Sequence, residues 1–543
     1  MKAGEAALRG NVLFYRGTSD LRPCPPSMTR EDRASCYGLA AFRRACVRLY
    51  RPLVAALLVP LFLAGGQSVR PPDQANRTNP EVDAALSAPP ELGADLLITI
   101  AQGPHLSKKD RIEILVRAFD LAGSAKYALR RTPATAAAYN TDSDAGTISA
   151  ALRPGLDRLS LQSRVIKELA LLEPALARRL FDTSRHISIP SLTCEDALGY
   201  SLDEFYQSAL AVISHTYSAK EAADGEPVTL AEDLLRHAAS PFQLNGALQL
   251  LLHDKWSTDE LQTLASVFAA TLAQLSADDR SFTAGTNFSA LQSLIRLVAR
   301  LRTNNINPYP VIRAFREYLV RHLRASRCAD TAQSEEISRL VDLFNQDLIS
   351  KFTDLRPITA EDRKPNRVMD TTARVYKFWS TTESEQLLND LRQLRFGGRD
   401  EQEARKKSNV KRPDGLAPFL TTAERSTVSW QASFDAFMNR FYHWEGRSTE
   451  PSLVQFYQKC SILEGLIAIV PDPERKQALM RDLLTYLAMT EVRQMNPPVW
   501  RLQLDRAFAM PELSETERTA LRELAKLSGD PYMRILSSRS RGR

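Results

Sequence analysis

Apolar residues recur at helical spacing over most of the chain beyond residue 90. Between Leu161 and Leu180 they are separated by 4, 4, 3, 4 and 4 positions, which marks one face of an α-helix or of two helices in close succession. The same spacing returns at 288–301 and at 513–527. Alternation of apolar and polar positions, the mark of a half-buried strand, is nearly absent. The pattern predicts an all-α protein.

Helix-start signals agree with this periodicity. In a capping box, a Ser or Thr oxygen accepts a free backbone N–H and a Glu three positions later returns the bond. Matches precede apolar segments at Ser201/Glu204, Thr229/Glu232, Ser257/Glu260, Thr382/Glu385, Thr421/Glu424 and Ser514/Glu517. Proline suits the first turn of a helix, and it follows an acid or an asparagine at Glu173-Pro174, Asn307-Pro308, Asp472-Pro473 and Asn496-Pro497. We expect roughly sixteen to twenty helices joined by short turns.

So many short-linked helices favour stacked helical hairpins, in an α-solenoid or an α/α superhelix. Two segments, LLEPALARRLF at 171–181 and VPDPERKQALM at 470–480, resemble the helix-turn-helix junctions of tetratricopeptide-like repeats. The chain as a whole resembles uncharacterised exported bacterial all-helical proteins with such hairpins. The resemblance implies helical hairpins and carries no ligand or activity with it.

Composition divides the chain into unequal parts. Apolar periodicity lapses at 353–370, so an arrangement of the chain in two helical subdomains is compatible with the sequence. We expect the following organisation: export signal region 1–66, disordered linker 67–90, N-terminal helical domain 91–352, linker 353–370, C-terminal helical domain 371–536 and disordered tail 537–543.

The export prediction rests on residues 43–66. Basic residues precede an apolar run of about thirteen residues, too short to span a bilayer comfortably, and small residues follow before Gln67, which is the order of a secretory signal. A start at Met28 would give a more ordinary signal length. We expect a periplasmic or secreted protein, and an uncleaved signal that anchors it to a membrane is the alternative. The four basic residues are Arg43, Arg44, Arg48 and Arg51.

The net charge of +7 belongs almost wholly to residues 1–66. Residues 1–66 hold ten Lys or Arg and four acids, a net of +6, so residues 67–543 carry only +1. A basic balance points to polyanions only when the folded body carries it. We therefore expect no nucleic-acid partner, and membrane contact only through an uncleaved N-terminal segment.

Cysteine spacing predicts no disulfide framework. Residues 67–543 keep Cys194, Cys328 and Cys460, which are far apart and odd in number. Three buried thiols are the expectation, and one long-range bridge stays open as the alternative.

Residue constellations for catalysis, metals or cofactors are missing. The chain has no HExxH, GxSxG, Walker loop, Rossmann glycine fingerprint or CxxC, and no two histidines have the spacing of zinc ligands on a helix. We therefore expect no cofactor and no metal. A basic loop at 405–412 is interpreted as solvated surface.

Two groups combine acids with aromatic residues and are the candidate binding residues. The first lies in CEDALGYSLDEFYQS and comprises Tyr200, Glu204 and Tyr206. The second comprises His443, Trp444 and Glu445. Each could hold a sugar or a peptide, and each is also compatible with a helix start or end that has an aromatic ring packed behind it.

The sequence favours an exported scaffold or a module that binds a protein or peptide, and it leans away from an enzyme because no catalytic constellation is present. The alternative is an all-helical hydrolase or lyase acting on a cell-envelope polymer through paired carboxylates. Two free acids that face each other in a deep cleft would favour the alternative.

Overall fold

The computed structural model describes residues 80–276, 278–331, 334–352, 354–397, 420–444 and 452–539. These lie within one compact unit, Thr78–Arg543. The predicted export segment 1–66, the basic loop 405–412 and Glu445 fall outside the described residues.

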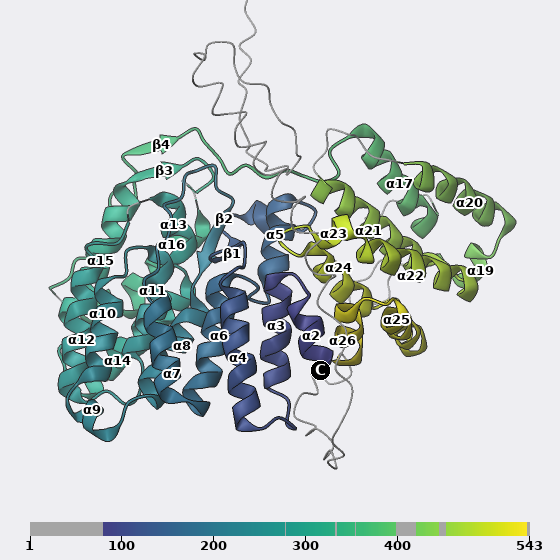
Figure 1. Cartoon of the computed structure of the whole chain (residues 1–543). Coiled ribbons are helices and arrows are strands. Elements are labelled where there is room, and N and C mark those ends of the chain that lie inside the picture. The colour runs from purple at the N-terminus through teal and green to yellow at the C-terminus, as the bar shows by residue number, and fades with distance from the viewer. Residues whose placement is uncertain are drawn as a thin grey trace, which may run out of the picture. The chain divides into compact units, whose positions relative to one another are not determined.

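The first half of the unit is helical with two short strands (Figure 1). Its elements are α2 Pro80–Leu86, α3 Pro90–Ala101, α4 Lys108–Ala122, β1 Arg130–Pro133, α5 Asp144–Leu152, α6 Arg158–Leu172, α7 Pro174–Ser184, β2 Leu198–Ser201, α8 Asp203–His215, α9 Ala219–Ala223, α10 Glu226–Arg236, α11 Leu244–Leu251 and α12 Thr258–Thr271.

The second half repeats this character. Its elements are α13 Asp279–Gly285, α14 Phe288–Thr303, α15 Tyr309–Arg324, β3 Ser326–Cys328, α16 Glu335–Asp347, β4 Arg367–Met369, α17 Thr382–Phe396, α19 Thr422–Arg425, α20 Val428–His443, α21 Ser452–Ile469, α22 Pro473–Ala488, α23 Thr490–Arg493, α24 Val499–Phe508, α25 Glu515–Leu527 and α26 Pro531–Arg539. The all-α prediction is confirmed.

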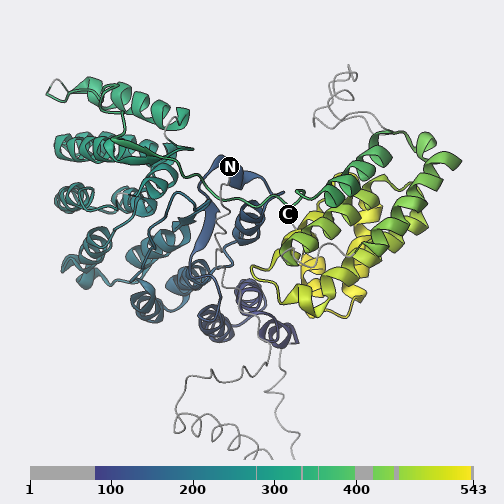
Figure 2. The same ribbon diagram turned by 90° about the horizontal axis from the view of Figure 1, so that it is seen from above.

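Helices between α3 and α16 contact one another in two rows. One row passes through α6, α8, α11, α14 and α16, and the other through α10, α12 and α15. In Figure 2 several of these purple-to-teal helices are seen nearly end-on, so their axes run in roughly the same direction. Their apolar faces form the core, in which Leu161, Leu248 and Phe315 are fully buried. Burial of these stripes is what holds helices of this length together.

Both repeat-like junctions form helical hairpins. Glu173 separates α6 from α7, and residues 470–472 separate α21 from α22. Proline occupies the first helical position of α7 and of α22, where its missing N–H costs nothing.

Both predicted flexible ends extend too far into the fold. The predicted linker 67–90 contains α2, because Val82 and Ala85 are buried where α2 packs against α3 and α26. The predicted tail 537–543 begins inside α26, which ends at Arg539. Composition reveals neither, because α2 is a seven-residue helix in a proline-rich stretch and the last residues of α26 are polar.

Strands are few among the described residues. β1 and β2 pair antiparallel, with Arg131 opposite Tyr200. β3 and β4 pair parallel, with Arg327 opposite Val368. β4 lies in the stretch between α16 and α17, most of which is irregular. This is the part of the chain where the apolar periodicity of the sequence lapses.

Contacts between chain segments far apart in sequence close the unit. Helix α24 contacts α5, and α26 contacts α2. Tyr457 of α21 donates a hydrogen bond to Asp142, 2.5 Å away. No helix in the part of the chain that the structure describes is long and apolar enough to cross a membrane.

Candidate functional site: a cleft at a disulfide

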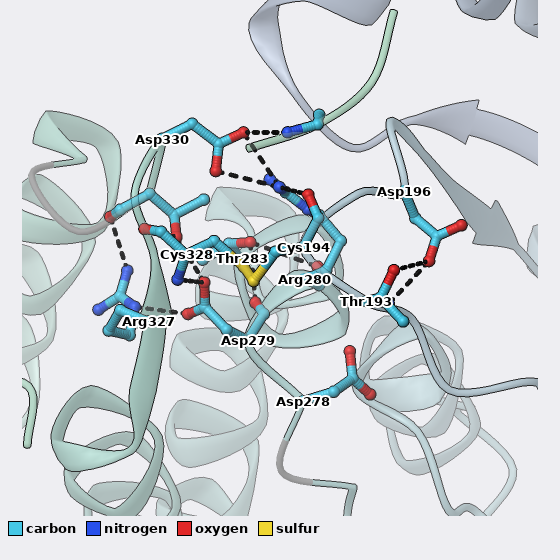
Figure 3. Close-up of a disulfide and its surroundings, with 12 residues drawn as sticks. Thr193, Cys194, Asp196, Asp278, Asp279, Arg280, Thr283, Arg327, Cys328 and Asp330 are labelled. Atoms are coloured by element: carbon cyan, nitrogen blue, oxygen red, sulfur yellow. Dashed lines mark hydrogen bonds and ion pairs between the residues drawn. A yellow bond between two sulfur atoms is a disulfide. The ribbon is translucent and has the colours of Figure 1, made fainter. Parts of the chain in front are cut away.

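A cleft of about 670 Å³ opens where four segments meet. Residues 192–195 precede β2, residues 278–280 begin α13, Ser326 and Cys328 belong to β3, and Met369 and Thr371 lie at the end of β4. Figure 3 shows these segments around a disulfide.

Cys194 and Cys328 form that disulfide, with their Cα atoms 5.5 Å apart. The expectation of three buried thiols is therefore wrong, and the long-range bridge is correct. Cys460 keeps its thiol, and burial raises its pKa well above the usual value. A separation of 134 residues leaves no local signal, so spacing could not have identified the pair.

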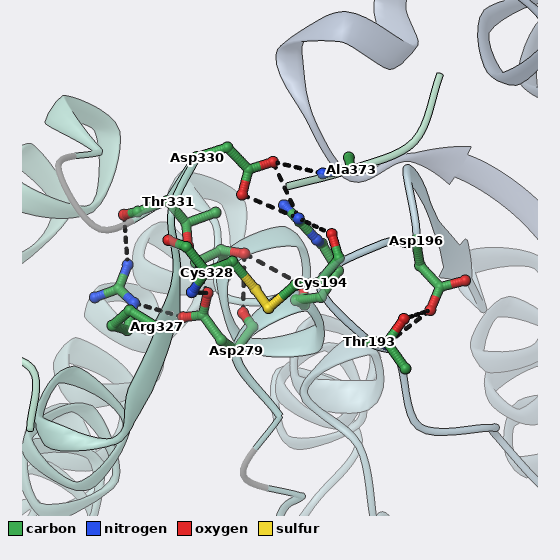
Figure 4. Close-up of polar contacts among 11 residues, drawn as sticks. Thr193, Cys194, Asp196, Asp279, Arg327, Cys328, Asp330, Thr331 and Ala373 are labelled. Carbon is green, nitrogen blue, oxygen red and sulfur yellow. Dashed lines mark hydrogen bonds and ion pairs between the residues drawn. A yellow bond between two sulfur atoms is a disulfide. The ribbon is translucent and has the colours of Figure 1, made fainter. Parts of the chain in front are cut away.

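Asp279 anchors β3 to the start of α13. Its Oδ2 accepts the backbone N–H of Cys328 at 2.9 Å and the hydroxyl of Thr331, and its Oδ1 lies 2.5 Å from Nε of Arg327 (Figure 4). Asp279 and Arg327 are both buried. A buried carboxylate that accepts two hydrogen bonds and contacts a guanidinium has most of its acceptor sites filled. Asp279 therefore supports the wall of the cleft structurally.

Arg280 ties three segments together from a fully buried position. Its Nη2 donates to the carbonyl of Cys194 at 2.7 Å and to both carboxylate oxygens of Asp330 at 3.0 Å. Asp330 also accepts the backbone N–H of Ala373 at 3.4 Å. The Arg280 guanidinium thereby links Cys194 of the disulfide to Asp330 after β3, and Asp330 in turn links to Ala373 after β4.

The remaining acids at the cleft also have partners. Glu195 pairs with Arg374 at 2.5 Å, and Asp278 accepts the backbone N–H of Ser281 at 2.7 Å as the N-cap of α13. The described residues hold no group of three or more His, Cys, Asp or Glu that could bind a metal. Glu195, Asp278 and Asp279 are thus each held by an ion pair or a backbone donor.

The first predicted group lies away from this cleft. Tyr200 is buried on β2 between Arg131, whose guanidinium is 4.4 Å from the ring centroid, and Phe242. Glu204 pairs with Lys167 at 3.1 Å. Tyr206 is buried and lines a separate pocket of about 250 Å³. Burial raises the pKa of the Tyr206 hydroxyl, which therefore stays protonated.

The second predicted group is at the end of α20. Nδ1 of His443 hydrogen-bonds the carbonyl of Asn439 at 2.7 Å, and Trp444 is buried. Within the described residues no ring contact, ion pair or hydrogen bond connects this group to Tyr200 or Tyr206. Tyr200 thus lies on β2 and Glu204 and Tyr206 lie in the first turn of α8, whereas His443 and Trp444 lie at the end of α20.

Of the residues that build the cleft, the sequence singles out only Cys194 and Cys328, which are expected to be thiols, and Glu195, which lies in the segment CEDALGYSLDEFYQS. Asp278 lies directly before α13 and Asp279 is its first residue, and an acid at such a position is a readable N-cap signal. Arg280 and Asp330 come together only through tertiary structure.

The chain matches no protein-family model, and neither a curated protein nor a solved structure is significantly similar to it. What the cleft does must therefore be inferred from its own residues and their contacts.

Proposed function

We propose that this chain is an exported helical binding protein that holds an extended peptide segment of a partner protein in the disulfide cleft. The observation that carries the proposal is the cleft itself. It joins a disulfide to the end of a strand, β4, that has a strand partner on one side only among the described residues.

Export is supported by two independent features. Disulfides persist in oxidising compartments and are rare in the cytosol, and Cys194 is bonded to Cys328. Residues 43–66 have the order of a secretory signal.

Peptide binding is supported by the edge of β4. Extended peptides bind exposed strand edges through main-chain hydrogen bonds, while neighbouring pockets receive their side chains. Val368 on β4 is exposed, and Met369 and Thr371 line the adjoining cleft. The backbone hydrogen bonds of Arg367–Met369 within the described residues are those of the ladder with β3.

A carboxylate-based hydrolase or lyase has less support. Such an enzyme needs two facing acids that are free to exchange protons. Glu195 and Asp279 at this cleft are held by ion pairs, and Asp278 caps a helix.

Binding can be tested with random peptides displayed on phage and selected against the full chain. Thr371→Trp would fill the cleft from an exposed position, whereas Thr263→Trp places the same ring on the exposed face of α12. The proposal predicts that selected peptides bind the Thr371 variant at least about tenfold more weakly and the Thr263 variant unchanged. It fails if no peptide is enriched, or if both variants bind the enriched peptides equally.

A further inference from the structure

Positive charge is concentrated in one helical hairpin. Residues 288–327 contain eight arginines and a single acid, Glu317, although residues 67–543 together carry a net of only +1. These residues form α14, α15 and β3. Seven of the arginines lie on α14 and α15, and the eighth, Arg327, is buried against Asp279. A nearly neutral body thus carries a locally basic hairpin, and local charge is what attracts an anion.

Three arginines converge on Asp362. Nη2 of Arg324 lies 2.6 Å from Oδ1, and Nη2 of Arg356 lies 3.2 Å from both oxygens. Nη2 of Arg316 lies 3.9 Å from Oδ2. The side chain of Asp362 is 1% exposed, so the ion pairs are made by a buried carboxylate.

The helix and the following loop create this convergence. Arg316 and Arg324 are eight residues apart on α15, about 12 Å along its axis, so their long side chains can reach a point between them. The chain after α16 folds back onto α15. Nε of Arg316 donates to the carbonyl of Arg356 at 2.6 Å, and the N–H of Asn366 donates to the carbonyl of Arg324 at 2.9 Å.

One carboxylate does not neutralise this group. Three guanidinium groups against Asp362 leave two positive charges, and the carboxyl end of α15 offsets only about half a charge. Asp362 also accepts the N–H and the hydroxyl of Thr359, at 3.1 and 3.0 Å. The carboxylate of Asp362 therefore contacts Thr359 as well as the three arginines.

Donors remain exposed at the same place. The side chains of Arg324 and Arg356 are 47% and 68% exposed. A guanidinium has five N–H donors, and the side-chain hydrogen bonds that Arg324 and Arg356 donate within the described residues use Nη2 alone. Neighbouring Arg313 and Arg363 differ, because each has its own carboxylate, Glu317 and Asp342.

We propose that Arg316, Arg324 and Arg356, fixed around Asp362, form a binding site for a tetrahedral oxyanion, a phosphate or sulfate group. Guanidinium forks match the paired oxygens of such a group. Hydrogen bonds to Asp362 hold the guanidinium groups of Arg324 and Arg356 in place, so the site is formed before the anion binds. The site is independent of the disulfide cleft.

Calorimetric titration of the full chain with inorganic phosphate and with sulfate at low ionic strength tests the site. Arg356→Gln changes the most exposed member, and Arg324→Gln changes a second one. Arg313→Gln is the matched control, because Arg313 is 61% exposed on the same helix but paired with Glu317. We expect affinity to fall at least about tenfold in each of the two site variants and to stay unchanged in the control. Absence of phosphate and sulfate binding by the wild-type chain, or equal binding by folded Arg356→Gln, overturns the proposal.

A second arm identifies the source of the anion. Flotation with phosphatidylcholine vesicles, with and without phosphatidic acid, presents the phosphate on a lipid headgroup. Flotation that depends on phosphatidic acid and is lost in Arg356→Gln supports a headgroup as the source. Calorimetric binding without such flotation supports a free anion.

Discussion

Arg501 of α24 donates a hydrogen bond to Asp95 of α3 at 2.6 Å, across 406 residues of sequence. Arg164 of α6 donates to the other oxygen of Asp95 at 2.8 Å. Burial raises the pKa of the Asp95 carboxyl, but the two guanidinium groups outweigh burial and hold that pKa below its usual value. The carboxylate thus joins the C-terminal helices to the N-terminal ones through charge-assisted hydrogen bonds.

Removing Arg501 should destabilise the whole unit. In Arg501→Met, buried Asp95 keeps only Arg164, and breaking a buried ion pair by losing one partner costs about 3–5 kcal/mol. Urea unfolding at pH 7 measures the change. Arg117→Met is the control, because Arg117 and Glu113 form an exposed pair on α4, and it should change the free energy of unfolding by less than about 1 kcal/mol. Equal effects of the two substitutions would show that the Asp95 contact contributes little.

Reduction of the disulfide should lower stability markedly. A cross-link that closes a loop of this length stabilises by about 4–5 kcal/mol in the chain-entropy account. We expect tris(2-carboxyethyl)phosphine to lower the urea midpoint of the wild type and to leave Cys194→Ala/Cys328→Ala unchanged. Cys460→Ala should respond to the reductant as the wild type does. A wild type that is insensitive to complete reduction would contradict this.

Glu464 should make stability depend on pH. Burial raises its pKa to about 7, with Arg506 opposing the rise and Glu512 adding to it. Its Oε1 is buried and has no hydrogen-bond partner among the described residues. Because the folded pKa lies above the unfolded value of 4.5, this group costs stability as pH rises from about 4.5 to about 7, and the cost then stays constant.

Glu464→Gln keeps the side chain neutral at every pH. We expect it to be more stable than the wild type by about 1–3 kcal/mol at pH 8 and similar to it at pH 5, as measured by urea unfolding at both values. A difference that does not vary with pH would show that the carboxyl titrates normally.

Gly246 on α11 should not tolerate a side chain. Alanine in a helix interior is normally favoured over glycine by about 1 kcal/mol, but a Cβ at Gly246 would overlap the ring of Tyr206. Overpacking of this kind costs about 1–3 kcal/mol, so thermal unfolding of Gly246→Ala should occur at lower temperature. Gly465→Ala on α21 is the control, because its Cβ meets only the end of the flexible Leu391 side chain. A Gly246 variant as stable as the control would mean that Tyr206 moves freely.

Local sequence patterns predict the all-helical class correctly, but they place only some of the helix starts correctly. The boxes at Ser257, Thr421 and Ser514 form as expected. The match at Thr229 is wrong, because α10 already begins at Glu226. The four-residue pattern cannot register the left-handed Gly225, whose φ of 80° is what precedes that helix.

Two further matches at helix starts also fail. At α8 the N-cap is Leu202 and makes no side-chain cap, so the match at Ser201 is wrong. At α17 the cap is Thr381 rather than Thr382, one position early. A capping box depends on the extended backbone of the cap residue, which sequence does not reveal when several Ser or Thr stand together.

The candidate sites were less predictable because their members are distant in sequence. Arg280 meets Asp330 across 50 residues and Cys194 across 86. Tyr200 and Tyr206 are aromatic residues beside acids in the sequence, yet their rings are part of the core. Proximity along the chain identifies helix ends, whereas a cleft is made by tertiary packing.

We propose that this helical body belongs to an exported, oxidised protein. Mass spectrometry of the protein purified from its producing cells, digested without reduction after thiol alkylation, tests it most directly. We predict a mature N-terminus near Gln67 and one linked peptide pair joining Cys194 to Cys328. Alkylated Cys194 and Cys328 in a chain that still begins at Met1 or Met28 would contradict the account.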